Sequence, residues 1–92
     1  MTVVTFLTEE SLVSVPLSEL SLHMEERYGE CVIDSCRGLE VRRTNLLFRG
    51  TFEECQQALK VIFDFIARCG QIETPSIMID MEAVAQAAKK RA

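Results

Sequence analysis

The chain has 92 residues, of which 48% are hydrophobic and 26% are charged, and its formal net charge is −4. This length suits one domain over residues 1–92 with a single core, and the composition is unlike that of disordered chains. The acidity argues against a general nucleic-acid binder, which usually has a basic domain, and the apolar runs are too short for a transmembrane helix.

The first third of the chain predicts two strands followed by a helix. Residues 2–7 are rich in Val, Thr and Phe and predict a strand, whereas residues 12–15 predict a short strand or an irregular segment. Ser18 is a good N-cap, and apolar residues starting just before it recur at the helical spacing i, i+3, i+7 and i+11. These residues are Leu17, Leu20, Met24 and Tyr28. The spacing predicts a helix over residues 18–28 that ends at Gly29.

The middle of the chain predicts a short strand and then a β-hairpin. Residues 31–34 begin with the apolar run Cys31-Val32-Ile33 and predict a strand. Residues 39–43 and 46–50 alternate in polarity on either side of a two-residue turn, as hairpin strands do. In that register Phe48 lies opposite Val41 on the core side of the hairpin.

Residues 51–69 predict one long helix that is too apolar for a single buried face. The helix opens with the capping box Thr51-Phe52-Glu53-Glu54 and ends at Gly70. Its apolar residues span roughly 200° of arc, about twice the usual stripe. We expect a sheet to cover most of this surface. The flanks near Phe63 and Phe65 then pack against another part of the chain or against a partner surface.

The last residues predict a strand over 76–79 and a final helix capped by Asp80. The complete order is then β-α-β-β-α-β plus a C-terminal helix, which predicts an α+β fold. This order resembles a ferredoxin-like plait, in which two helices pack on one face of an antiparallel sheet. A KH-like arrangement is the nearest alternative, although the GXXG loop of KH domains is missing.

The sequence predicts no catalytic, cofactor or metal site. His23 is the single histidine, and the predicted helix places it on a solvated face. Cys31 and Cys36 form at most a zinc half-site with His23. We expect all four cysteines, which include Cys55 and Cys69, to be reduced and to act as small hydrophobic residues. A small enzyme centred on His23 and a cysteine is the least favoured alternative.

Arginines gather around the predicted hairpin. One interpretation is a charged edge that prevents sheets from aggregating. The other is a tip that contacts a phosphate backbone or a carboxylate-lined partner, because guanidinium groups suit both. The candidate partner-binding residues are Arg37, Arg42, Arg43, Arg49, Phe63 and Phe65.

The overall profile is that of a short, acidic, globular chain without an active-site set. This profile is similar to that of the small phage-encoded accessory proteins that block host machinery, including anti-CRISPR proteins. The resemblance implies a non-enzymatic protein without a cofactor that acts by occluding a protein or ribonucleoprotein partner. The alternative is a self-associating regulatory domain of ferredoxin-like fold that binds a ligand as a homodimer. The N-terminus lacks a basic region and a cleavage site, so we expect a cytoplasmic protein that does not engage a membrane.

Overall fold

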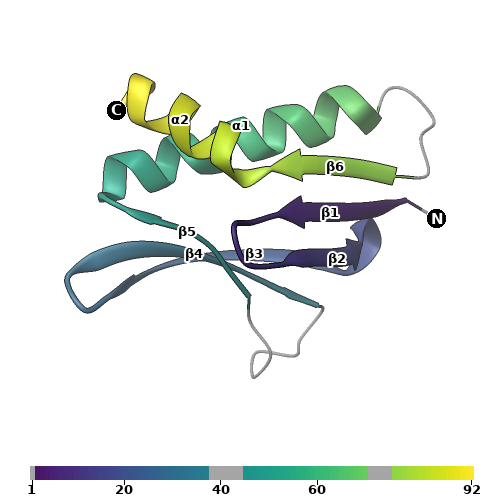
Figure 1. The fold of residues 1–92 in the computed structure, drawn as a ribbon, viewed down its shortest axis with the longest axis horizontal. Coiled ribbons are helices and arrows are strands. Elements are labelled where there is room, and N and C mark those ends of the chain that lie inside the picture. Colours follow the sequence, from purple (N-terminus) through teal and green to yellow (C-terminus); the bar gives the residue numbers. More distant parts are fainter. Residues whose placement is uncertain (1, 38–44, 71–75) are drawn as a thin grey trace.

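The computed structural model describes residues 2–37, 45–70 and 76–92 of the chain. The fold is α+β, as predicted, with strands in two sheets and two helices that lie together along one side (Figure 1). The elements are β1 (Val3–Leu7), β2 (Leu12–Pro16), a 3₁₀ turn (Leu17–Glu19), β3 (Leu20–Arg27), β4 (Glu30–Arg37), β5 (Asn45–Gly50), α1 (Phe52–Gly70), β6 (Ser76–Asp80) and α2 (Met81–Arg91).

Sheet A joins the two ends of the chain. Its strand order is β2-β1-β6, in which β1 runs antiparallel to β2 and parallel to β6. Alternate residues of each strand point inward, because successive side chains of a strand face opposite sides. The inward residues are Val4, Phe6, Val13, Val15, Ile77 and Ile79, and all are buried in the core.

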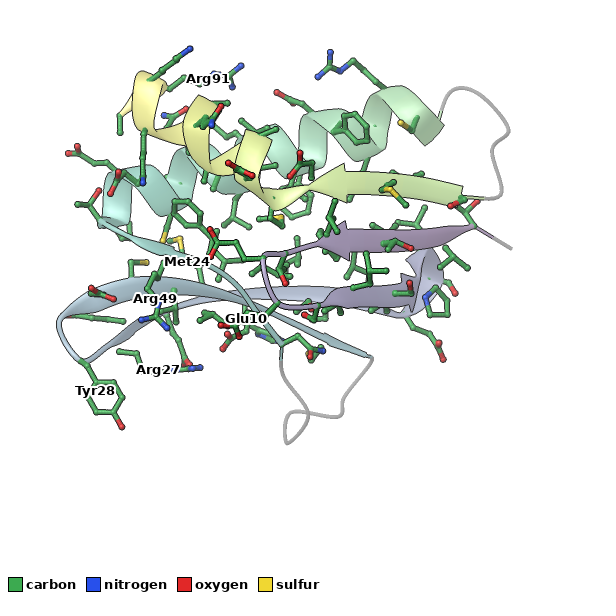
Figure 2. The ribbon with its side chains drawn as sticks, in the orientation of Figure 1. Glu10, Met24, Arg27, Tyr28, Arg49 and Arg91 are labelled. Carbon is green, nitrogen blue, oxygen red and sulfur yellow. The ribbon has the colours of Figure 1, made fainter. Side chains whose placement is uncertain are left out.

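Sheet B is an antiparallel meander of β3, β4 and β5. Tyr28 and Gly29 form the two-residue turn between β3 and β4, with φ angles of 52° and 80°. Positive φ at both positions is the geometry of a type I′ turn, whose twist matches that of the flanking strands. Tyr28 is fully exposed at the tip of this hairpin (Figure 2).

We expect Tyr28→Asn to raise the free energy of unfolding by about 1 kcal/mol, because Asn tolerates positive φ far better than a bulky aromatic residue. Tyr28 makes no buried contact that the substitution would remove. Urea denaturation followed by circular dichroism measures the change. Tyr28→Val is the matched control and should destabilise the chain, since β-branched residues disfavour this conformation. Equal stability of the two variants would contradict the prediction.

The helix predicted over residues 18–28 is wrong, because these residues form the end of the 3₁₀ turn and strand β3. Leu20, Leu22 and Met24 alternate along β3 and pack against the core, whereas His23 points outward and is exposed. The element order therefore differs from that of a ferredoxin-like plait. The predicted strand over residues 39–43 lies outside the described residues.

The 3₁₀ turn carries the chain from sheet A to sheet B. It follows Pro16, and the Leu17 N–H donates a 2.8 Å hydrogen bond to the Thr2 carbonyl at the start of β1. This bond fixes the corner between the two sheets to the first strand.

The long helix α1 begins with the predicted capping box. The Glu54 N–H donates to Thr51 Oγ1 at 3.1 Å, and the Thr51 N–H donates to Glu54 Oε1 at 2.9 Å. The hydrogen bond from Thr51 is the main reason that the pKa of Glu54 lies below its ordinary value. A reciprocal pair of this kind satisfies two N–H groups that the first turn of a helix leaves without partners.

The apolar arc of α1 is only partly covered. Cys55, Ala58 and Ile62 form its buried stripe, and α2 packs beside it through a second stripe of its own. The buried residues of α2 are Met81, Val84 and Ala88. Phe63 and Phe65 remain 55% and 37% exposed, so the chain's own last helix does not cover them. No helix in the described segments is long and apolar enough to span a bilayer.

Candidate partner-binding cleft

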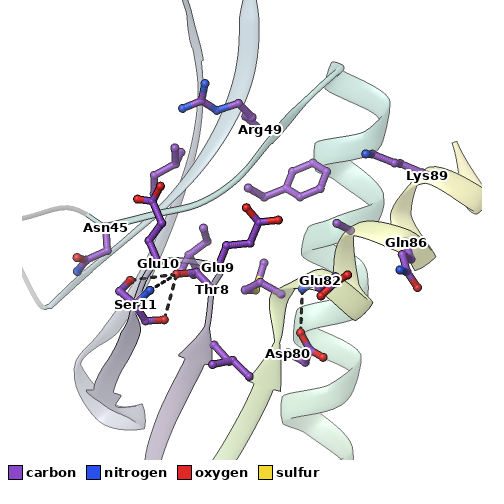
Figure 3. Close-up of a pocket in the computed structure, with 16 residues that line it drawn as sticks. Thr8, Glu9, Glu10, Ser11, Asn45, Arg49, Asp80, Glu82, Gln86 and Lys89 are labelled. Carbon is purple, nitrogen blue, oxygen red and sulfur yellow. Dashed lines mark hydrogen bonds between the residues drawn. The ribbon is translucent and has the colours of Figure 1, made fainter.

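A cleft of about 960 Å³ opens where sheet A, strand β5 and helix α2 meet (Figure 3). We call it the β5 cleft. Three segments that are distant in sequence line it: the β1–β2 turn, strand β5, and the junction of β6 with α2. The lining residues are Leu7, Thr8, Glu9, Glu10, Ser11, Asn45, Leu46, Leu47, Phe48, Arg49, Asp80, Met81, Glu82, Ala85, Gln86 and Lys89.

One wall of the cleft is the edge of strand β5. Within the described residues β5 pairs with β4 on one side and with no strand on the other. Five consecutive residues, Asn45 to Arg49, line the cleft. The cleft therefore runs along β5, beside the edge that pairs with no strand among the described residues, and unpaired edges of this kind offer main-chain N–H and C=O groups to other chains.

A β-bulge lies in the middle of this edge. Ile33 pairs with Phe48, but Asp34 pairs with Leu46, so Leu47 is an extra residue in β5. The bulge allows Leu47 and its neighbour Phe48 both to be buried, while Leu46 remains 42% exposed. Bulges of this kind re-aim side chains and are frequent next to functional sites.

The opposite wall begins with the tight turn between β1 and β2. The Thr8 N–H donates to the Ser11 carbonyl at 3.0 Å, and the Ser11 N–H donates to Thr8 Oγ1 at 3.0 Å. These bonds fix the tip of the turn, which presents the exposed Glu9 and Glu10. Figure 3 shows the Glu9 side chain pointing into the cleft.

Helix α2 completes the wall. Asp80 caps the helix, because its Oδ1 accepts a 3.0 Å hydrogen bond from the Glu82 N–H. Glu82 follows in the first turn, and Lys89 lies two turns further on, close enough to Glu54 to help lower the pKa of that carboxyl. The cleft is therefore acidic near the turn and the cap and basic where β5 leads into α1.

Of the residues predicted to bind a partner, Arg49 lines the β5 cleft and is exposed. Arg37 ends strand β4, and its side chain is not among those described. Arg42 and Arg43 lie outside the described residues. Phe63 and Phe65 are exposed on α1, away from the cleft lining. The structure thus brings one predicted residue into the cleft.

A second polar group lies on the outer face of sheet B. His23 Nε2 is 3.1 Å from Cys36 Sγ and 3.1 Å from Ser21 Oγ. Asp34 is opposite His23 in the strand register, but its carboxylate pairs with Arg27, which also bonds Glu25. Hydrogen bonds to Glu25 and Asp34 raise the pKa of Arg27 above its ordinary value. The thiol and imidazole that a nucleophilic site needs are thus together, which the helix prediction did not foresee.

Burial limits the reactivity of the Cys36 thiol, because Cys36 is only 1% exposed and the His23 ring lies beside its sulfur. We expect His23→Ala to increase several-fold the rate at which Cys36 reacts with a thiol reagent, because removing the ring opens a path to the sulfur. Mass spectrometry of the Cys36 peptide over time measures the rate. Ser21→Ala, which keeps the ring, should leave the rate unchanged. A slower reaction in His23→Ala would instead favour an imidazole that activates the thiol.

The two cysteines of the predicted zinc half-site do not face the same side of their strand. Cys31 and Cys36 are five residues apart on β4 and therefore lie on opposite faces of the strand, so they cannot share an ion. Across residues 2–37, 45–70 and 76–92, no three His, Cys, Asp or Glu side chains are grouped so that they could hold one. Comparison of the chain with protein-family models, with curated proteins and with solved structures gives no match.

Proposed function

We propose that this chain is a non-enzymatic binding protein that acts by occlusion, and that its partner docks in the β5 cleft. The partner is a protein or the protein part of a ribonucleoprotein complex. The observation that carries the proposal is the β5 edge, whose five consecutive residues line an open cleft. Exposed strand edges are common docking sites for other chains, and proteins otherwise cover or shorten them.

The composition of the cleft supports the same proposal. Its floor contains buried apolar side chains, Leu47, Phe48 and Met81, and its rim is charged. A desolvated apolar centre with a polar rim is the usual anatomy of a protein–protein interface. The buried Cys36 thiol favours binding over thiol chemistry at the other polar group.

Affinity capture from the native cell tests the proposal with three forms of the full chain. The first is the wild type. The second is Leu46→Arg, which places a long cation at the exposed part of the β5 edge. The third is Tyr28→Arg, a matched control at the distant hairpin tip that keeps the same charge change.

We expect the wild type and Tyr28→Arg to capture the same partner, and Leu46→Arg to capture at least about tenfold less, because the substitution removes an apolar contact and places a charge at the centre of the proposed interface. Circular dichroism confirms that each variant is folded. Equal capture by Leu46→Arg would contradict the proposed docking site. Phe63→Arg, examined in parallel, tests whether the exposed flank of α1 contributes to the same interface.

A further inference from the structure

We infer that the occupant of the β5 cleft is an extended peptide segment with lysine or arginine side chains, which adds to sheet B as a new strand beside β5. This inference rests on the proposed function of the cleft and specifies the chemistry of the partner. It follows from the shape of the edge, the charges of the rim and the apolar floor.

The shape of the site fits an extended chain. At about 3.4 Å per residue, Asn45 to Arg49 offer roughly 17 Å of edge, which matches a partner strand of about five residues. Among the described residues no main-chain or side-chain hydrogen bond joins this edge to α2 or to the β1–β2 turn. Strand addition would satisfy these main-chain groups and would give affinity that does not depend on the partner's sequence.

The charges of the rim select a basic segment. The lining contains four carboxylates and two cationic side chains, and the carboxylates come from the β1–β2 turn and from the junction of β6 with α2, not from β5 itself. Glu9, Glu10 and Glu82 form no ion pair within the part of the chain that the structure describes. Four carboxylates around one cleft repel one another, and a cationic side chain from a partner relieves that repulsion.

The floor of the cleft suits the stems of the same side chains. Phe48 and Met81 form the floor but are almost fully buried, so the apolar surface that a partner meets comes mainly from Leu7 and Leu46, which are 39% and 42% exposed. Lysine and arginine pack their methylene groups on such a surface while their charged ends reach outward. Because β-strand side chains alternate, every second residue of the added strand would face this floor.

The other candidate occupants fit less well. A helix has already paired its main-chain groups and would leave the β5 edge unsatisfied. A nucleic acid would bring phosphates against the four carboxylates. A second copy of this chain, with its net charge of −4, would be repelled by the same rim.

Selection from a phage-displayed library of random dodecapeptides on the immobilised full chain tests the inference. We expect the recovered peptides to carry Lys or Arg at alternate positions and to lack Asp and Glu. A synthetic copy of the most enriched peptide then gives the affinity by fluorescence anisotropy. Amide chemical-shift mapping on the ¹⁵N-labelled chain should place it at residues 45–49. Recovery of no peptide, or of peptides without basic residues, would overturn the inference.

Two matched comparisons separate strand addition from simple charge attraction. Glu9→Lys with Glu10→Lys should weaken the peptide at least about tenfold, whereas Glu53→Lys with Asp64→Lys, on the exposed surface of α1, should change the affinity less than about twofold. N-methylation of one alternating set of peptide amides should weaken binding at least about tenfold, and methylation of the other set should be tolerated, because only alternate amides face the β5 edge.

Each remaining outcome contradicts a specific part of the inference or of the proposed function. Tolerance of both methylated sets would indicate side-chain or helical docking and would overturn strand addition. Displacement of the peptide by a single-stranded oligonucleotide, or dimerisation of the chain through the β5 edge, would overturn the assigned partner. If Leu46→Arg abolishes partner capture while the library gives no peptide, the proposed function stands and this inference fails. If peptides bind the chain but Leu46→Arg captures the native partner as well as the wild type does, the proposal that the native partner docks in the β5 cleft is contradicted instead.

Discussion

Phe6→Ala is expected to lower the free energy of unfolding by about 3–5 kcal/mol, the usual cost of truncating a buried phenylalanine. Phe6 is 0% exposed and lies on β1, the central strand of sheet A, between Val13 of β2 and Ile79 of β6. Its loss would leave a cavity that faces the helices, and neighbouring strands on both sides limit how far the core can collapse. Urea denaturation followed by circular dichroism measures the change.

Leu12→Ala is the control for this truncation. Leu12 is 64% exposed on β2, and its substitution should change the free energy of unfolding by less than about 0.5 kcal/mol. A loss of stability in Leu12→Ala as large as that in Phe6→Ala would show that the core does not lie between sheet A and the helices.

Stability is expected to fall steeply between pH 9 and pH 12, and Cys55→Ala is expected to remove a large part of that fall. Burial, and then a hydrogen bond with the Cys31 side chain, raise the pKa of Cys55 from 9.0 to about 12. The unfolded chain therefore loses this proton near pH 9, whereas the folded chain keeps it until about pH 12. In that window the free energy of unfolding should fall as the pH rises, because the unfolded chain releases the proton and the folded chain does not.

Urea midpoints measured from pH 8 to pH 12 give the pH dependence of each variant. Cys69→Ala is the control, because Cys69 is only partly buried near the end of α1. This control should follow the wild-type profile. If Cys55→Ala and the wild type remain parallel across the range, the Cys55 thiol is not the group that couples folding to alkaline pH.

The parts of the fold that the sequence predicts well have local signals. The capping box at Thr51, the cap at Asp80 and the alternating residues of β1 each specify an element within a few neighbours. Residues 18–28 are different, because the apolar residues in and just before this segment fit two patterns. Leu17, Leu20 and Met24 have helical spacing, whereas Leu20, Leu22 and Met24 alternate as in a strand. Pairing with β4 decides between them, and this is a tertiary effect.

The candidate site could not be predicted from the sequence for a related reason. Glu9 and Glu10 are recognisable as a break between strands, and Asp80 as a helix cap, but nothing local shows that they face the same cleft. That proximity depends on the parallel pairing of β1 with β6, which joins residues more than 70 positions apart. Arg49 lines the cleft, and the strand that carries it has a clear pattern in the sequence. Of the other arginines predicted around the hairpin, Arg37 ends β4, whereas Arg42 and Arg43 lie in residues that the structure does not describe.

The parallel pairing of the first strand with the last also constrains how the chain folds. Sheet B is built from neighbouring segments, and its hairpins can close early because short loops cost little entropy. Sheet A has to wait for β6, since β1 has only a two-stranded ribbon with β2 until the C-terminal part of the chain arrives. Two of the three walls of the β5 cleft depend on that last step. A nascent chain that has not yet reached β6 and α2 therefore has no complete cleft, and the cleft forms only after these elements have been synthesised.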